Sequence, residues 1–143
     1  FGHVETKKWA LNANGIGPTP GEEKALTVCS KQTTGADGGE YCIIWLGPEF
    51  PGDQRRDDSG SLTFDTAPLA QGMDLVGGAV LHLKVSSDKP VAVAAVRLNS
   101  VWPDGAVSRL TYAVANLCHR DSHDKPQAFA VFCAQATIRG SVP

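Results

Sequence analysis

Hydrophobic and polar residues alternate over short stretches of this chain, and turn residues separate the stretches. The clearest alternation is Val80–Ser87, where every second residue from Leu81 to Val85 is aliphatic and His82 falls on the opposite face. The following stretch, Val91–Leu98, is almost continuously apolar, which is typical of a strand buried on both faces. Helical periodicity is nearly absent. The pattern therefore predicts β-strands, with His82 facing solvent.

Strands are expected at intervals of about 8–15 residues, joined by segments rich in Gly and Pro. The chain has 15 Gly and 9 Pro. One connection, Pro103-Asp104-Gly105, predicts a tight turn because Pro fixes φ and Gly accepts a positive φ. The fold class predicted is all-β, a single antiparallel sandwich domain over residues 1–143 that resembles a jelly roll. The expected strands are Lys8–Asn12, Ala25–Ser30, Tyr41–Leu46, Ser61–Asp65, Val80–Ser87, Val91–Leu98 and Arg109–Leu117.

Composition narrows the class of protein. Of the 143 residues, 42% are hydrophobic and 20% are charged, which is typical of a globular chain. A formal net charge of −2 argues against a nucleic-acid partner or an anionic membrane surface. No apolar run approaches the roughly 20 residues of a membrane helix, and no signal peptide is recognised. The chain begins at Phe1 and not at Met, so we expect processing or excision from a longer protein, and the location is weakly constrained, with the cytoplasm favoured.

The four cysteines are Cys29, Cys42, Cys118 and Cys133. They form no CxxC pair, and no histidine lies at zinc-finger spacing from them, so we expect neither a zinc site nor another cofactor. Two of the four lie in apolar, strand-like contexts, where a thiol packs as a small hydrophobic group. We therefore expect reduced cysteines, while a disulfide stays open for a secreted protein.

Catalytic signatures are not recognised in the sequence. There is no GxSxG nucleophile motif, and we interpret the nearest string, Asp58-Ser59-Gly60-Ser61, as a turn. The segment His119-Arg120-Asp121-Ser122-His123 holds every residue type of a serine-hydrolase triad. On an extended chain its two histidines would lie about 13 Å apart, too far to share a metal ion. We expect Arg120 and Asp121 to hydrogen-bond a loop, and the histidines to contact buried carbonyls or a neighbouring domain.

A second polar block, DQRRDD, runs from Asp53 to Asp58. It lacks the alternating carboxylates, central Gly and distal Glu of a calcium loop. Arg–carboxylate pairing is the expected alternative. Arg97 interrupts the apolar strand Val91–Leu98, and a charge at such a position is tolerated only when it is paired or at the surface. We predict that Arg97 meets a carboxylate of this block.

Four blocks carry a resemblance to a known family: DQRRDDSGSLTFDTAPL, SSDKPVAVAAVRL, VWPDG and NLCHRDSH, all between Asp53 and His123. In this order and at these distances they resemble the C-terminal β-sandwich domain of the CocE/NonD hydrolases, which include cocaine esterases and X-Pro dipeptidyl-peptidases. The resemblance covers about residues 7–126 and weakens from Gln127 onward. If strands of the family are missing after that point, exposed sheet edges and apolar surface would favour pairing with another copy.

The resemblance implies a galactose-binding-like jelly roll that is an accessory domain without a catalytic residue of its own. The reaction, cleavage of ester or X-Pro bonds, would belong to an N-terminal α/β-hydrolase domain whose Ser–His–Asp triad is absent from this chain. That catalytic domain is the expected partner, together with a second copy in a homodimer, and no cofactor or metal is expected. The structural or interdomain candidates are Asp53, Arg55, Asp57, Asp58, Arg97, Asp104, His119, Arg120, Asp121 and His123.

Two rival interpretations remain. The first is an independent module that binds carbohydrate or another small ligand on its loops. Its stacking residues would come from Trp9, Trp45 and Trp102, although scattered tryptophans are more often core or interdomain residues. The second, an independent enzyme that uses His119 and His123, has the least support.

Overall fold

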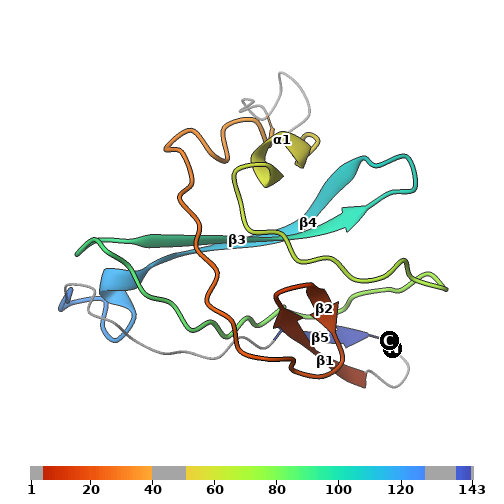
Figure 1. Cartoon of the computed structure of the whole chain (residues 1–143), viewed down its shortest axis with the longest axis horizontal. Coiled ribbons are helices and arrows are strands. Elements are labelled where there is room, and N and C mark those ends of the chain that lie inside the picture. Colours follow the sequence, from red (N-terminus) through yellow and green to blue (C-terminus); the bar gives the residue numbers. More distant parts are fainter. Residues whose placement is uncertain (1–4, 40–50, 128–137, 143) are drawn as a thin grey trace. The chain divides into compact units, whose positions relative to one another are not determined.

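The computed structural model describes residues 5–39, 51–127 and 138–142, the last of these as backbone. Over these residues the chain is all-β, as the sequence predicts, with two antiparallel sheets and two helical turns of four and three residues (Figure 1). None of the helices in these ranges is long and apolar enough to cross a membrane. The elements are β1 Glu5–Asn12, β2 Gly15–Gly17, α1 Arg55–Asp58, β3 Val93–Val101, β4 Val107–Asn116, the 3₁₀ turn η1 Leu117–His119, and β5 Ile138–Val142.

The chain divides into two compact units. Unit 1 comprises Phe1–Leu26, Thr63–Asp88 and Phe129–Pro143, and unit 2 comprises Thr27–Leu62 and Lys89–Ala128. The single domain expected over residues 1–143 stays a prediction.

Unit 1 contains a three-stranded sheet in the order β2-β1-β5, whose strands are labelled in Figure 1. β1 confirms and extends the strand predicted at Lys8–Asn12. It pairs with β2 through a tight hairpin in which Asn12 lies opposite Gly15, and with β5 in a register that places Trp9 opposite Ile138. The Asn12 side chain also accepts from the backbone N–H of Gly21 at 2.6 Å, which fastens the segment that leaves the hairpin.

Three of the predicted strands are wrong as regular strands. Ala25–Ser30 and Ser61–Asp65 form no ladder, and Val80–Ser87 contributes only isolated bridge residues at Val80 and Val85. Alternating exposure nevertheless persists from Val80 to Ser86, and His82 is exposed as predicted. A side-chain pattern is local, whereas a strand needs a partner for its backbone groups, and the described residues supply none here. Tyr41–Leu46 lies outside the described residues.

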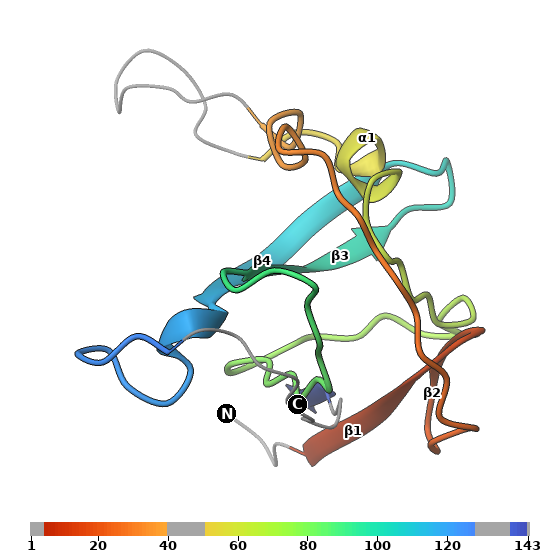
Figure 2. The same ribbon diagram turned by 60° about the vertical axis from the view of Figure 1, so that its left-hand side comes forward.

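Unit 2 is organised by the antiparallel hairpin of β3 and β4, which Figure 2 shows from the side. Its turn confirms the expectation for Pro103-Asp104-Gly105, because Gly105 has φ +84° and the Gly105 N–H donates to the carbonyl of Trp102 at 2.9 Å. The Asp104 carboxylate accepts from the N–H of Ala106 at 3.0 Å, so this candidate residue closes the turn. The register shifts between Leu98 and Asn99, which is a β-bulge.

The strand expected at Val91–Leu98 is present as β3, shifted toward the turn, but its burial on both faces is wrong. Val93 and Val101 at its two ends are 61% and 60% exposed. The residues between them are half-buried, except Ala95, which is exposed. β4 is exposed from Leu110 to Asn116, and the predicted strand Arg109–Leu117 corresponds to it. A continuous apolar run can therefore mark surface that the described residues of this chain leave uncovered, and not only a doubly buried strand.

Candidate functional site

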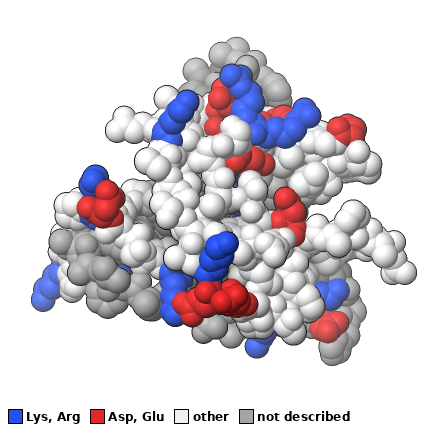
Figure 3. Space-filling model, in the orientation of Figure 1, with Lys and Arg blue, Asp and Glu red and all other residues white. Residues whose placement is uncertain are grey.

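The most deeply buried side chains among the described residues are polar. Gln54 has no exposed surface and Asp57 is 3% exposed. Both lie beside the turn end of the β3–β4 hairpin, where the segment around α1 meets β3, and charged side chains of both signs gather there on the surface (Figure 3). We call Gln54, Asp57, Asp58 and Arg97 the polar cluster.

Gln54 connects three parts of unit 2. Its backbone N–H donates to the carbonyl of Val107 at 3.0 Å, which attaches the start of α1 to β4. Its side-chain Nε2 donates to the carbonyls of Gly38 and Gly52 at 2.8 and 2.7 Å, and its Oε1 accepts from Nη1 of Arg97 at 3.2 Å. Both ends of the buried amide are thus satisfied, as burial of a polar group requires.

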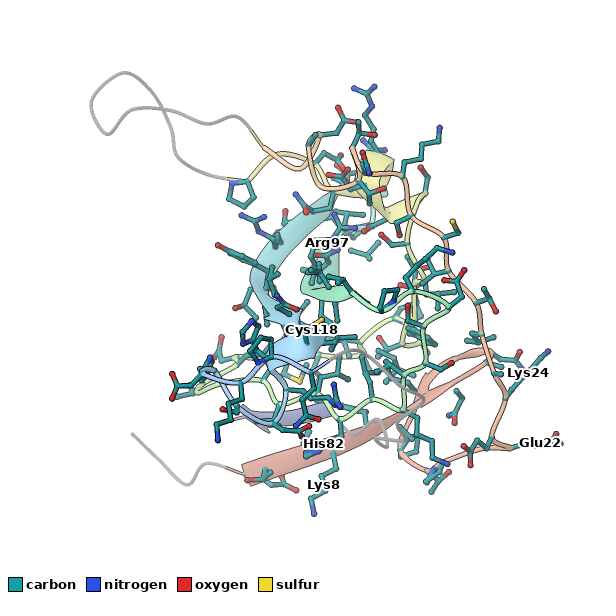
Figure 4. The ribbon with its side chains drawn as sticks, turned by 90° about the vertical axis from the view of Figure 1, so that its left-hand side faces the viewer. Lys8, Glu22, Lys24, His82, Arg97 and Cys118 are labelled. Atoms are coloured by element: carbon teal, nitrogen blue, oxygen red, sulfur yellow. The ribbon has the colours of Figure 1, made fainter. Side chains whose placement is uncertain are left out.

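Arg97 leaves the middle of β3 and reaches the α1 segment (Figure 4). Its Nη2 donates to Oδ1 of Asp58 at 2.8 Å and to the hydroxyl of Ser61 at 3.2 Å, and its Nη1 lies 3.7 Å from Oδ2 of Asp57. The predicted pairing of Arg97 with a carboxylate of the DQRRDD block is therefore confirmed. With 17% of its side chain exposed, the guanidinium is held in a setting where paired charges interact more strongly than at an open surface.

The Asp57 carboxylate also contacts the loop that contains Gly35. Its Oδ1 accepts from the N–H of Gly35 at 2.7 Å, which ties down the loop that precedes residue 39. Its Oδ2 is buried without a hydrogen bond in the described residues, and the attraction of Arg97 offsets its charge. A Cβ on Gly38 would lie 2.9 Å from this oxygen and 3.1 Å from Oε1 of Gln54. Only glycine therefore allows the loop backbone to approach the cluster so closely.

The outer side of the block is solvated and makes local contacts. Asp53 accepts from the backbone N–H and the Nε of Arg55 at 3.0 and 2.9 Å. The pKa of Asp53 is lowered mainly by the side-chain hydrogen bond from Arg55, and the same hydrogen bond raises the pKa of Arg55. Both side chains are exposed, so we assign this pair the role of a local, weakly stabilising contact on the chain before α1.

The serine hydroxyls near α1 are donors to backbone carbonyls. Ser59, the C-terminal cap residue of α1, donates to the carbonyl of Arg56 at 2.6 Å, and Ser61 donates to that of Asp57 at 2.9 Å. These bonds confirm the interpretation of Asp58–Ser61 as a turn.

The HRDSH segment is not extended, and this corrects the geometry assumed from its sequence. Leu117–His119 is a 3₁₀ turn, begun by the Asn116 side chain, which accepts from the N–H of Cys118 at 3.0 Å. The chain then folds back, so that Nδ1 of His119 lies 2.9 Å from the carbonyl of His123. That carbonyl is exposed and not buried as expected.

Arg120 and Asp121 make the loop contacts expected of them. Arg120 Nη1 donates to the carbonyl of Leu117 at 3.0 Å, and its Nε lies 3.3 Å from the carboxylate of Asp121. The roles of these residues and of His123 toward another domain stay predictions.

Over residues 5–39 and 51–127, no three His, Cys, Asp or Glu side chains gather as metal ligands would. Within the same ranges Cys29 is an exposed free thiol and Cys118 a buried one, whose Sγ lies 3.5 Å from the carbonyl of Pro90. Cys42, Cys133 and Trp45 lie outside the described residues. An open pocket of about 360 Å³ borders Cys118 and is lined mainly by Pro90, Val91 and Pro126.

The sequence-predicted residues thus separate into three groups. The polar cluster brings together Asp57, Asp58 and Arg97, while Asp53 and Arg55 pair outside it, and Asp104 and the HRDSH residues lie at other turns of unit 2. Sequence reasoning missed Gln54 and Gly38. Gln54 lies inside the quoted block, but a single amide in a charged segment carries no signal that distinguishes burial from solvation.

The geometry defines a class of protein: an all-β domain whose buried polar groups brace one end of a hairpin. In the comparison with protein families, the family described as the X-Pro dipeptidyl-peptidase C-terminal non-catalytic domain matches residues 2–135. The chain therefore belongs to this family, and the resemblance seen in its sequence is confirmed. The matched range begins before Lys7 and continues past Gln127, the residue from which the resemblance in the sequence weakens. No curated protein and no solved structure matches the chain.

Proposed function

We propose that this domain packs on the α/β-hydrolase catalytic domain of a serine peptidase and helps to wall its substrate pocket. Its contribution is to position the parts of the parent enzyme and to exclude water, while the Ser–His–Asp triad of the other domain performs the hydrolysis. The observation that carries the proposal is the family match over residues 2–135, since the family is described as a non-catalytic part of a peptidase.

The chemistry of the polar cluster supports a structural role. Arg97, Gln54 and Asp58 use their hydrogen-bonding groups on partners inside unit 2. His119, one of the two histidines considered as a base, lies with its Nδ1 2.9 Å from the backbone carbonyl of His123. Groups that are engaged in holding a fold are suited to rigidity, which is what an accessory wall requires.

The proposal includes two finer features that follow from the resemblance. One is the galactose-binding-like jelly roll, for which the two antiparallel sheets are suitable components. The other is a supporting role in a homodimer of the parent enzyme. Both are tested by the oligomeric state and the structure of the complete peptidase.

The first experiment treats the purified chain with a fluorophosphonate probe and assays p-nitrophenyl esters and X-Pro anilides. We expect neither labelling nor turnover; stoichiometric labelling would contradict the proposal, because the sandwich would then carry its own nucleophile. The second experiment deletes this domain from the full-length peptidase. We expect a lower melting temperature or a higher KM for the X-Pro anilide, and unchanged kinetics together with unchanged melting would contradict the packing role.

A further inference from the structure

One half of the β3–β4 hairpin presents an apolar surface that the described residues of the chain do not cover. The cross-strand register pairs Ala95 with Val114 and Arg97 with Tyr112, and directly opposed residues lie on the same face of a sheet. Val93 lies on that face too, two residues before Ala95 along β3. We call Val93, Ala95, Tyr112 and Val114 the bare face. Val93, Tyr112 and Val114 are 61%, 62% and 61% exposed, and Ala95 is also exposed.

The sheet face that carries the bare face is covered by the α1 segment nearer the hairpin turn. At Arg97 and Asn99 the same face of β3 meets the α1 segment, through Arg97 to Asp58 at 2.8 Å and Asn99 to Asp58 at 3.4 Å. Toward Val93 no segment among residues 5–39 and 51–127 covers this face in the same way. A two-stranded sheet with an apolar face is marginal in water unless further strands or another element cover it. This half of the hairpin is therefore suited to a partner.

The charge beside the bare face indicates the chemistry of that partner. The guanidinium of Arg109 lies 4.7 Å from the centre of the Tyr112 ring, a cation–π contact that holds both side chains in place. Arg109 forms no ion pair with any described residue, whereas Arg97 across the strand is already paired with Asp58. A Tyr–Arg pair beside apolar residues is a composition that is common at interface hot spots. A complementary surface would bring apolar side chains and a carboxylate toward Arg109.

We infer that the bare face docks the catalytic domain of the parent peptidase, on a mainly apolar patch of that domain that carries an acidic residue opposite Arg109. The inference rests on the proposed function, because the family description makes this chain one part of a larger enzyme. A covalently linked domain is favoured over a second copy, because the linkage gives it a high effective concentration at this surface. In a symmetric contact, a second copy would also bring its own Arg109 toward the Arg109 of the first.

The test replaces Tyr112 with the photoreactive residue p-benzoylphenylalanine in the full-length peptidase and maps the cross-links by mass spectrometry. The matched control carries the same residue at Thr111, which is exposed, adjacent in β4 and paired with Leu98 on the opposite face. We expect cross-links from position 112 to peptides of the catalytic domain, several-fold more abundant than those from position 111. Cross-links to a second copy of this domain, equal yields from both positions, or none from position 112 would overturn the inference.

A charge reversal provides an independent measurement. Arg109→Glu in the full-length peptidase should accelerate limited proteolysis between the domains several-fold, because the acidic partner would now be repelled. Arg109→Lys should preserve most of the protection, since it keeps the positive charge. Equal rates for Arg109→Glu and the unaltered enzyme would count against the carboxylate.

Failure of this inference is distinguishable from failure of the proposed function. If deletion of the domain destabilises the peptidase but position 112 cross-links elsewhere or not at all, the domain packs through another face. If deletion changes neither melting nor kinetics, the proposed function itself is wrong.

Discussion

The two halves of the β3–β4 hairpin differ in how the same sheet face is completed. In the turn half, the α1 segment covers β3 with the polar cluster, and Val107 of β4 is buried to 7% exposure. In the open half, the bare face of Val93, Ala95, Tyr112 and Val114 remains at the surface. The comparison teaches that this chain secures its hairpin with a few directional polar contacts at one end and leaves apolar residues exposed at the other end, where we infer that a partner covers them.

The largest effect is expected when the guanidinium of the polar cluster is removed. Arg97→Ala would leave the buried carboxylate of Asp57 and the amide oxygen of Gln54 without their partner. Breaking one side of a buried ion pair costs about 3–5 kcal/mol of unfolding free energy. Urea denaturation followed by circular dichroism measures the loss.

Arg109→Ala is the matched control for that substitution, because Arg109 lies on the same sheet face and forms no ion pair with any described residue. It should cost no more than about 1 kcal/mol, the usual value of an exposed cation–π contact. Equal losses for the two variants would contradict the larger contribution expected from the polar cluster.

A second pair of substitutions tests apolar burial along one strand. Val107→Ala should lower the unfolding free energy by roughly 1.5–3 kcal/mol, because Val107 is buried against the turn half. Val114→Ala, at 61% exposure in the same strand, should change it by no more than about 0.5 kcal/mol in the isolated chain. Denaturant titration of both variants checks this, and a large loss from Val114→Ala would mean that the open half is already covered.

The close approach of the loop to the polar cluster gives the third prediction. Gly38→Ala places a methyl group 2.9 Å from Oδ2 of Asp57 and 3.1 Å from Oε1 of Gln54. Both of these side chains are buried and have no space to move aside. We expect a loss of about 1–3 kcal/mol, as for other forms of overpacking. Gly72→Ala, where a Cβ meets nothing within 4 Å, is the control and should be neutral in thermal melting. A neutral Gly38→Ala would show that the loop does not pack on Asp57 as described.

The smallest effect concerns pH. Because Arg55 lowers the pKa of Asp53, ionised Asp53 stabilises the fold at pH values above its ordinary pKa, and this contribution disappears as the pH falls through the lowered pKa. Arg55→Ala should raise the pKa of Asp53 toward the ordinary aspartate value, as measured by NMR titration of the carboxyl group. An unaltered Asp53 pKa would exclude Arg55 as the cause.

Several features could be predicted from sequence because they depend on neighbouring residues alone. The turn at Pro103-Asp104-Gly105, the strand character of Lys8–Asn12 and the exposure of His82 all follow from local geometry, and the structure confirms them. The pairing of Arg97 was predictable for a different reason. A charge within an apolar strand is tolerated only when it is paired or at the surface, and the structure shows that the DQRRDD block supplies its partner.

Other features depend on contacts between distant segments. Ala25–Ser30 has strand-forming residues but no ladder partner, and the apolar run of β3 suggested burial that its ends do not have. Gln54 is buried because Gly38, Gly52, Val107 and Arg97 converge on it. The local sequence does not predict that these four residues converge on Gln54.

By itself, then, the sequence determined the all-β class, the hairpin turn, the family and the need of Arg97 for a carboxylate, because each is set by backbone preferences or by the cost of an isolated charge. Only the tertiary structure decided which carboxylates and amide meet Arg97, that the HRDSH segment folds back at a 3₁₀ turn, and which half of the hairpin stays bare. The physical reason is that burial and hydrogen-bond satisfaction are properties of segments brought together by folding, and no single segment contains them.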